Sequence, residues 1–548
     1  MSPLGGFDQV VAITQKHIND NLIARYKLYK SLQAFTPKVE DEEDGSMQGT
    51  MDPPTVELVI PGEPRKARFL LHFKKGSTFN FRAKLDGDDK KTMHTLPMDG
   101  WTLAFIANLA PRSLQNVPDE MRSVISEDIC QKIEAAGSYS LQQIIIDVGT
   151  SDVLNFDLAH SVTPGLNPAN GKDIKQKKVL SDFLYLYLQE LSNGNHNVLG
   201  YAVTIEEVAL KPEDKPSLPP VLVKLQTMPY EAAANPAIAT SNERDAFLFC
   251  EMIGDTTGRS APANALEGAY AWCQPPNFGT MLISRASVWD RYFRDKICFL
   301  NSESIFLLNQ VGVWAQSEGK KGGTPGEVPA WDLTVGDFPF PEGTPPPSWT
   351  STTDTSAHYE WKGSKEIKPP RKWDGPSISY TTTSSSTVDV KIDLAANRFV
   401  VEGKLSYHYE DAFSHSTNYG FTSQQIHNTA EVQWILKLAF NSAGAGHLGF
   451  DEPVIEVPEC TCKKWRDQQG LFEMIFGGQF INQQLGELMT KVIKDRIASS
   501  KLVDHVRDGL KQQAGFVFPG GQTFKMKDPT FTHDGDLTVG LMYMGNKK

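Results

Sequence analysis

Long runs in which apolar and polar residues alternate constrain the fold of this chain more than any other feature. The clearest hairpin runs along 388–394, turns at Ala395–Arg398 and returns along 399–409, and a third such run follows at 432–440. Period-two alternation is typical of an antiparallel sheet with one buried face. Runs of eight or more residues exceed the usual strand of about 5–6 residues. The pattern therefore predicts long, strongly curved sheets.

Two segments predict amphipathic helices that such sheets would wrap. Near the start, Thr14 is placed to cap a helix near 15–30, whose apolar stripe includes Ile18, Leu22 and Tyr26. Near the end, 479–512 carries apolar residues at spacings of three and four, and a helix of that length would extend about 50 Å. Its stripe includes Ile481, Leu485, Leu488 and Val492.

Two shorter helices are also expected. Met281–Ile283 reads as a strand, and Ser284 after it would cap a helix that carries Val288 and Tyr292 on one face. A dense apolar run at 177–192 favours a buried helix over a strand, although runs of this kind lack clean periodicity.

These elements predict an α+β fold with two modules, in which long curved antiparallel sheets wrap long amphipathic helices. The expected divisions are an N-terminal module at 1–230, a strand–helix connection at 231–318, and a C-terminal module at 371–548. Between them, 319–370 is rich in proline and glycine, which is typical of a long loop or linker.

Charge and cysteine usage narrow the function classes. The 548 residues include 54 Lys and Arg against 66 Asp and Glu, for a formal charge of -12, which argues against a nucleic-acid partner. Six irregularly spaced cysteines do not form a disulfide scaffold. The first residues lack a signal-peptide pattern, and no run approaches the ~18 apolar residues that span a bilayer. We expect a cytoplasmic protein, or one exported without a classical signal peptide.

Motifs that would indicate an enzyme fail on inspection. Gly444–Gly449 matches a dinucleotide-binding pattern, but it follows an alternating strand and precedes Pro453, so we interpret it as a hairpin turn. Cys460 and Cys462 lack the spacing of a zinc site and read as strand residues. Gly258–Pro262 approaches a nucleophile elbow without its last glycine. We expect no catalytic residues, no metal and no cofactor.

One basic cluster precedes the predicted helix at 177–192. Lys172, Lys175, Lys177 and Lys178 could hold an anionic headgroup, and the alternative is a solvated loop, which is the commoner role of a charge run.

Short segments of the chain resemble a known family. Phe7–Thr14 with Ile18–Asn19, Gly279–Arg285, and the ending Phe518–Gly521 with Asp534–Leu537 resemble the family of the forty-seven-kilodalton protein encoded in clostridial botulinum neurotoxin clusters. That family is similar to the tubular lipid-binding (TULIP) superfamily, in which a curved sheet wraps a long helix beside an apolar groove. The resemblance implies binding of a lipid or another hydrophobic ligand, and it implies no catalytic residues.

The sequence thus favours non-enzymatic binding of a lipid or another hydrophobic small molecule between helix and sheet. The expected apolar lining includes Ile18, Leu22, Tyr26, Phe476, Ile481, Leu485, Leu488 and Val492, with Lys175, Lys177 and Lys178 at the headgroup. Two alternatives stay open. One is a toxin or toxin-accessory protein that acts through a protein partner or peripheral membrane contact, and the other is an enzyme with an unrecognised site.

Overall fold

The computed structural model describes most of the predicted strands. It covers residues 3–28, 32–35, 45–84, 89–114, 139–147, 157, 159–164, 185, 188–189, 192–193, 198–205, 220–230, 242–253, 259–263, 265–266, 270–273, 276–298, 300–301, 306–311, 332–337, 348–367, 377–417, 420–443, 447–451, 454–466, 491, 495, 516–517 and 524–543. Within these residues the strands form five sheets, and all of their pairings are antiparallel.

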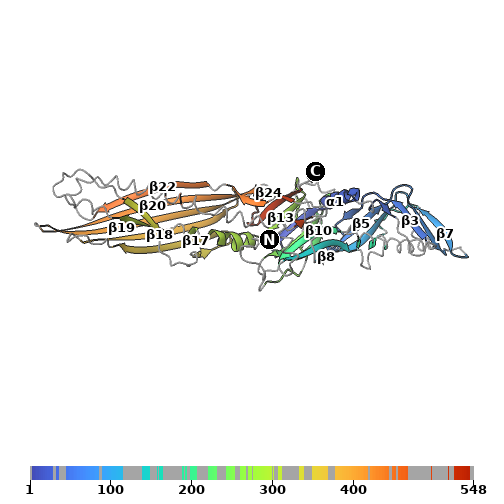
Figure 1. Cartoon of the computed structure of the whole chain (residues 1–548), viewed down its shortest axis with the longest axis horizontal. Helices are drawn as coiled ribbons and strands as arrows, with labels where there is room; N and C mark the ends of the chain where they lie inside the picture. Colours follow the sequence, from blue (N-terminus) through green and yellow to red (C-terminus); the bar gives the residue numbers. More distant parts are fainter. Residues whose placement is uncertain are drawn as a thin grey trace.

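The middle of the elongated molecule is a six-stranded sheet, here called the central sheet (Figure 1). Its strand order is β11-β12-β1-β13-β25-β24, so it joins the two ends of the chain. Its strands are β1 (Gln9–Thr14), β11 (Pro220–Met228), β12 (Ala246–Ile253), β13 (Gly279–Ile283), β24 (Phe524–Phe531) and β25 (Leu537–Tyr543).

Two sheets lie on the N-terminal side. The flanking sheet has the order β23-β10-β9-β8-β5-β4, and a smaller sheet has the order β2-β3-β6-β7. The flanking strands are β4 (Thr55–Glu57), β5 (Lys66–His72), β8 (Thr102–Leu114), β9 (Tyr139–Asp147), β10 (Val198–Ile205) and β23 (Phe516–Val517). The small sheet holds β2 (Ala34–Phe35), β3 (Gly45–Thr50), β6 (Thr78–Ala83) and β7 (Thr92–Pro97).

The opposite end is the long sheet, in the order β16-β17-β18-β19-β20-β21 with β22 also paired to β20. Its strands are β16 (Ser351–Thr352), β17 (Ser356–Ile367), β18 (Ser377–Asp393), β19 (Arg398–Thr417), β20 (Gly420–Ala443), β21 (His447–Phe450) and β22 (Val454–Arg466). A separate pair joins β14 (Phe306–Val311) to β15 (Asp332–Asp337).

The predicted hairpins are confirmed. Asn397 takes a left-handed φ of 52° in the turn between β18 and β19, and Val390 pairs with Val401 across that hairpin. The dinucleotide-like segment joins β20 to β21, with Ala443 paired to His447, as the hairpin reading requires. β17 lies inside the segment 319–370 that was predicted as a loop or linker, so Ser356–Ile367 is a strand of the long sheet.

The fold-class prediction of long helices wrapped by sheets is wrong. Among the described residues the helices are short: α1 (Gln15–Leu28), the 3₁₀ turn η5 (Asn242–Arg244), the π-helix η6 (Ala286–Phe293) and α5 (Arg294–Ile297). The reason is that the apolar faces of the central and flanking sheets share one buried cluster, so strands provide most of the cover that helices were expected to give. The fold is mostly antiparallel β.

The residues predicted to precede two helices, Thr14 and Ser284, do accept hydrogen bonds from the first turn of each helix. The Thr14 hydroxyl accepts a hydrogen bond from the backbone N–H of His17 at 3.2 Å, which caps α1 as predicted. The Ser284 hydroxyl likewise accepts from the Ser287 N–H at 3.2 Å, before a π-helix rather than the expected α-helix. Of the segment 177–192, Tyr185, Leu188, Gln189 and Ser192 are described, and all are helical.

Candidate functional site

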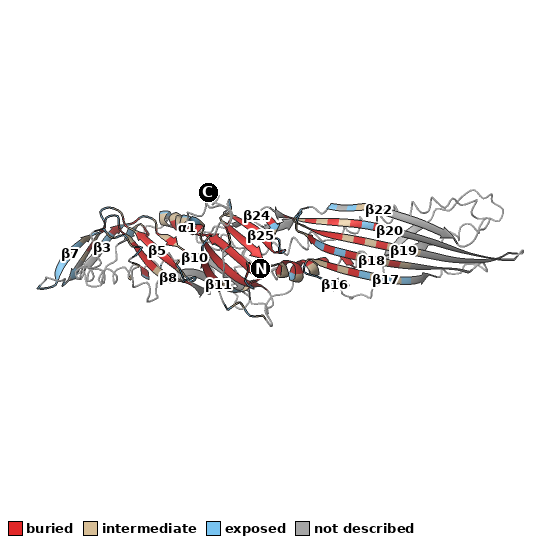
Figure 2. Cartoon of the chain, turned by 180° about the vertical axis from the view of Figure 1, so that it is seen from behind, coloured by how far each residue is buried: buried red, intermediate tan, exposed pale blue. Residues whose placement is uncertain are grey.

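The largest apolar region of the described chain is a single buried cluster, here called the interior. It includes Ile18 of α1, Phe105 of the flanking sheet, Phe249 of the central sheet, Phe293 of η6 and Leu436 of the long sheet. Because these residues come from every major layer, the interior continues from the flanking sheet to the long sheet along the molecule. Figure 2 shows the buried residues following this path.

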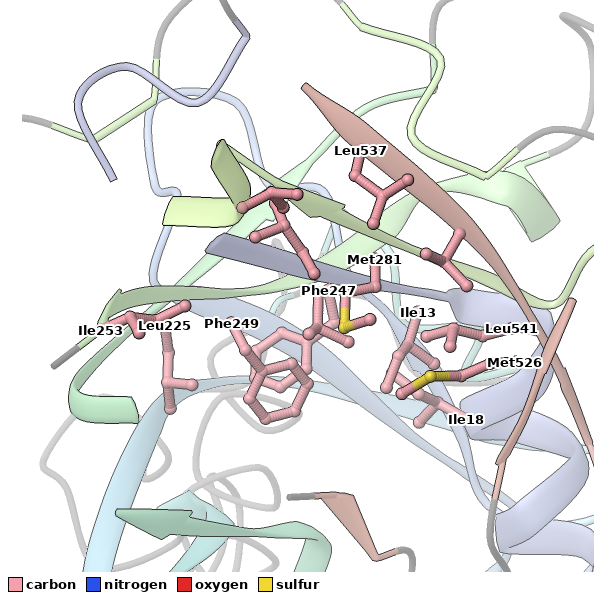
Figure 3. Packing of buried hydrophobic residues seen from close by; sticks show 14 of the residues in the cluster. Ile13, Ile18, Leu225, Phe247, Phe249, Ile253, Met281, Met526, Leu537 and Leu541 are labelled. Carbon is pink, nitrogen blue, oxygen red and sulfur yellow. The ribbon is translucent and has the colours of Figure 1, made fainter. Parts of the chain in front are cut away.

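One wall of the interior is the inner face of the central sheet, meaning the face that carries Val11 and Ile13. Strand register arranges its side chains in three rows that cross five strands, since alternate residues share a face. The rows are Val223–Glu251–Gln9–Ile283–Leu537, Leu225–Phe249–Val11–Met281–Val539 and Thr227–Phe247–Ile13–Gly279–Leu541. Figure 3 shows Phe247, Phe249, Met281 and Leu541 projecting from this face.

Helix α1 closes the interior at one side. Asn19 donates to the Val56 carbonyl oxygen at 3.1 Å and accepts from the Val56 N–H at 2.8 Å, and Gln15 accepts from the Leu58 N–H at 2.7 Å. These bonds attach the helix to β4 of the flanking sheet, while β1 leads into it from the central sheet. Ile18 is 2% exposed and lies near Met526 and Leu541 (Figure 3).

The helix residues predicted to contact a ligand divide into two kinds. Ile18 and Leu22 are buried in the interior, as their spacing predicted. Tyr26 is half-buried, and its hydroxyl donates to the Met51 carbonyl oxygen at 2.6 Å, so its polar end is bonded within the protein.

The other predicted lining and headgroup residues lie outside the described residues: Phe476, Ile481, Leu485, Leu488, Val492, Lys175, Lys177 and Lys178. Of the predicted helix at 479–512, the described residues are Lys491 and Asp495, which are both helical and exposed. The role of this segment stays a prediction.

Two polar side chains interrupt the inner face of the central sheet. Gln9 and Glu251 are register partners on β1 and β12, and the Gln9 amide nitrogen donates to Oε2 of Glu251 at 2.6 Å. Glu251 is fully buried, and burial raises the pKa of its carboxyl to about 8, against a smaller opposing effect of the Gln9 hydrogen bond. The carboxyl is therefore mostly protonated at neutral pH.

A charged cluster closes the same end of the central sheet. Asp8 accepts hydrogen bonds from Arg259 at 2.9 Å, from Arg291 of η6 at 2.8 Å and from the Ile253 N–H at 2.8 Å. Burial by itself would raise the pKa of Asp8, but the bonds from Arg291 and Ile253 and the charge of Arg291 outweigh it and hold the pKa below its usual value. This cluster attaches η6 to the sheet and pairs one carboxylate with two guanidinium groups.

The interior meets the long sheet through a group of aromatic rings. Phe293 of η6 stacks on Phe399 of β19 with ring centroids 3.6 Å apart, and Phe440 and Phe531 contact Phe399 edge-on at 5.4 and 5.3 Å. Farther along, the indole of Trp434 lies over Gly403, where an added β-carbon would clash with the ring. The glycine thus provides the space for a large buried side chain on the neighbouring strand.

Sequence reasoning missed Gln9 and Glu251, although a signal was present. The strand Ala246–Ile253 reads Ala-Phe-Leu-Phe-Cys-Glu-Met-Ile, so a single acid stands in an otherwise apolar run. Acids are almost never fully buried without a partner, which makes such a residue informative. Over the residues that the structure describes, there is no cluster of metal-ligating side chains, and no helix is long and apolar enough to cross a membrane.

Comparison with known proteins agrees with the resemblance seen in the sequence. No family model and no curated protein matches the chain. Among solved structures, it is similar to P47 from Clostridium botulinum A2, at 11% identity over 99% of this chain and 98% of that one, with a TM-score of 0.46. It is also similar to P47 of Clostridium botulinum E1, at 11% identity over 98% of each chain, with a TM-score of 0.43.

A third similar structure is a lipopolysaccharide binding protein, at 11% identity over 99% of this chain and 100% of that one, with a TM-score of 0.31. The predicted resemblance to the clostridial forty-seven-kilodalton proteins and to a TULIP-type protein is thus confirmed.

Proposed function

We propose that this protein binds a hydrophobic ligand of the lipid class in its interior and that it does so without catalysis. One observation carries this function: the larger apolar cluster is continuous from α1 through the central sheet to the long sheet. A continuous apolar path along an elongated molecule provides a surface that matches an extended hydrocarbon chain.

The energetics agree with a ligand of this kind. Burial contributes about 25 cal/mol for each Å² of apolar surface removed from water, so a long acyl chain gains affinity along its length. The described side chains of the interior are almost wholly hydrocarbon, and they include aromatic rings such as Phe247 and Phe249.

The first test is to identify what the purified protein carries. Native mass spectrometry followed by organic extraction should show a lipid or fatty acid in stoichiometric amount. A measured mass equal to that of the polypeptide alone, together with no uptake of a pyrene-labelled alkane, would contradict the proposal. Binding of a protein partner would then be the next hypothesis.

A matched pair of variants on β11 then tests the location. Leu225 lies on the inner face beside Phe249 and is 8% exposed, whereas Leu222 lies on the opposite face of the same strand and is 38% exposed. Leu225→Trp should fill the interior and lower ligand loading several-fold, while Leu222→Trp should leave loading unchanged. Equal loading of both variants, each shown to be folded by circular dichroism, would place the ligand elsewhere.

A further inference from the structure

The pair Gln9–Glu251 poses a hydrogen-bonding problem that the rest of the inner face does not. Both residues are buried, and the Gln9 nitrogen donates to Oε2 of Glu251. Among the described residues, neither Oε1 of Glu251 nor Oε1 of Gln9 has a hydrogen-bond partner. Leaving a buried polar atom unpaired is destabilising, so native proteins rarely keep two such atoms side by side without a use.

The protonation state of Glu251 decides whether each of the two unpaired oxygens donates or accepts a hydrogen bond. The raised pKa of Glu251, about 8, places a proton on its carboxyl at neutral pH. Since Oε2 already accepts a hydrogen bond from Gln9, the proton belongs on Oε1, which becomes a donor. Oε1 of Gln9 remains an acceptor. The pair therefore presents one donor and one acceptor on an apolar wall.

The surroundings show which chemical groups can approach. Val223 and Ile283 flank the pair in the same row, and Phe249 and Val11 lie in the next row. These are apolar side chains, and Arg259 and Arg291 at this end of the sheet are already bonded to Asp8, so a charged headgroup such as phosphate would have to lose its hydration against an apolar wall. An uncharged group that both donates and accepts would satisfy both free atoms.

We propose that Gln9 and Glu251 are the polar anchor for the ligand's head, and that this head is an uncharged hydroxyl or carboxylic acid on a long hydrocarbon chain. The inference rests on the proposed function, because it names the head of the same ligand. A hydroxyl would accept from Glu251 and donate to Gln9. A carboxylic acid would make the same two bonds through its two oxygens.

The test compares four ligands that share a twelve-carbon acyl or alkyl chain and differ at the head: dodecanol, dodecanoic acid, methyl dodecanoate and dodecane. Each is used to displace a pyrene-labelled alkane from the full-length protein. Dodecanol or dodecanoic acid should bind roughly tenfold or more tightly than dodecane, with the ester, which only accepts, in between. Comparison of the alcohol with the acid shows which head is preferred.

Three variants sharpen the test. Glu251→Gln keeps a donor and an acceptor in place and should retain the preference. The double variant Gln9→Leu/Glu251→Leu replaces both polar groups by apolar ones and should bind all four ligands about equally. Gln226→Leu is the control, because Gln226 lies on the outer face of the same sheet and is bonded to the backbone of Leu266.

The possible results distinguish failure of the Gln9–Glu251 anchor from failure of the proposed ligand-binding function. If the wild-type protein binds all four ligands with equal affinity, the anchor is overturned and the apolar site stands. If none of the four displaces the probe, the proposed function falls and the anchor with it. Should the double variant not fold, a crystal structure of the wild-type protein with dodecanol decides: a hydroxyl bonded to Glu251 and Gln9 supports the anchor, and a hydroxyl elsewhere overturns it.

Discussion

The central sheet and the long sheet are both antiparallel and both contribute to the interior, but they are built in opposite ways. In the central sheet both faces are buried: β1 and β12 are buried at every position, with a second cluster around Trp272 covering the outer face. In the long sheet burial alternates along the described stretches 383–392 of β18 and 431–440 of β20 (Figure 2). Its exposed face carries cross-strand ion pairs such as Lys391–Glu402 and Lys437–Glu456.

The two sheets also differ in how far apart in the sequence their paired strands lie. The strands β17 to β20 of the long sheet follow one another and pair as successive hairpins, whereas β1 pairs with β12 and β13, more than two hundred residues later. A sheet of successive hairpins is specified by local pattern and turns. A sheet covered on both faces depends on distant segments, and it is also the place where a buried polar pair can be held rigidly.

The largest expected effect on the free energy of unfolding is at the aromatic group where the interior meets the long sheet. Phe399→Ala removes the ring that contacts Phe293, Phe440 and Phe531, and the resulting cavity should lower the free energy of unfolding by about 3–5 kcal/mol, measured by urea denaturation. Phe531→Ala, in the same group but only half-buried, should cost clearly less. Equal losses would show that the junction does not depend on the Phe399 stack.

The second effect belongs to the central sheet and depends on pH. Glu251 has a pKa of about 8 when folded, against 4.5 ordinarily, so the unfolded state loses its proton first as pH rises. Its contribution to stability therefore falls between about pH 4.5 and 8, by a few kcal/mol at about 1.4 kcal/mol per pKa unit. Glu251→Gln should remove this fall in urea titrations across that range. Glu402→Gln, on the exposed face of the long sheet, is the control, and an unchanged slope in Glu251→Gln would contradict the burial argument.

A smaller effect tests the packing of the long sheet. Gly403→Ala forces its new β-carbon against the buried indole of Trp434 and should cost about 1–3 kcal/mol. In a Trp434→Val background the same substitution should cost little, because the ring is gone. A double-mutant cycle on thermal unfolding measures the difference. Additive costs would mean that the indole does not limit residue 403.

The smallest effect is expected on the solvated face of the long sheet. Lys404 pairs with Glu431 at 3.2 Å, and both side chains are more than two-fifths exposed. Lys404→Ala should change the free energy of unfolding by less than about 1 kcal/mol. A larger loss in urea denaturation would show that this face is covered in solution, for instance by a second molecule.

The comparison also explains what could be predicted from the sequence. The hairpin at Asn397 and the strand with Trp434 were readable, because alternation and turn residues are local signals. The caps at Thr14 and Ser284 were readable for the same reason. The pairing of Gln9 with Glu251 was not, because no local pattern brings together residues 242 positions apart. The expected fold class gave too much weight to helices, because among the described residues the apolar faces of the central and flanking sheets pack in one cluster.

The central sheet has a consequence for how the protein is made. β1 leaves the ribosome first and β25 last, and β13, which lies between them in the sheet, pairs with both. At about 5–20 residues per second, synthesis of the chain takes roughly half a minute to two minutes. For roughly the first half of that time the apolar strand at Gln9–Thr14 has neither of its sheet partners, β12 and β13, so a chaperone that covers this strand should raise the yield of folded protein.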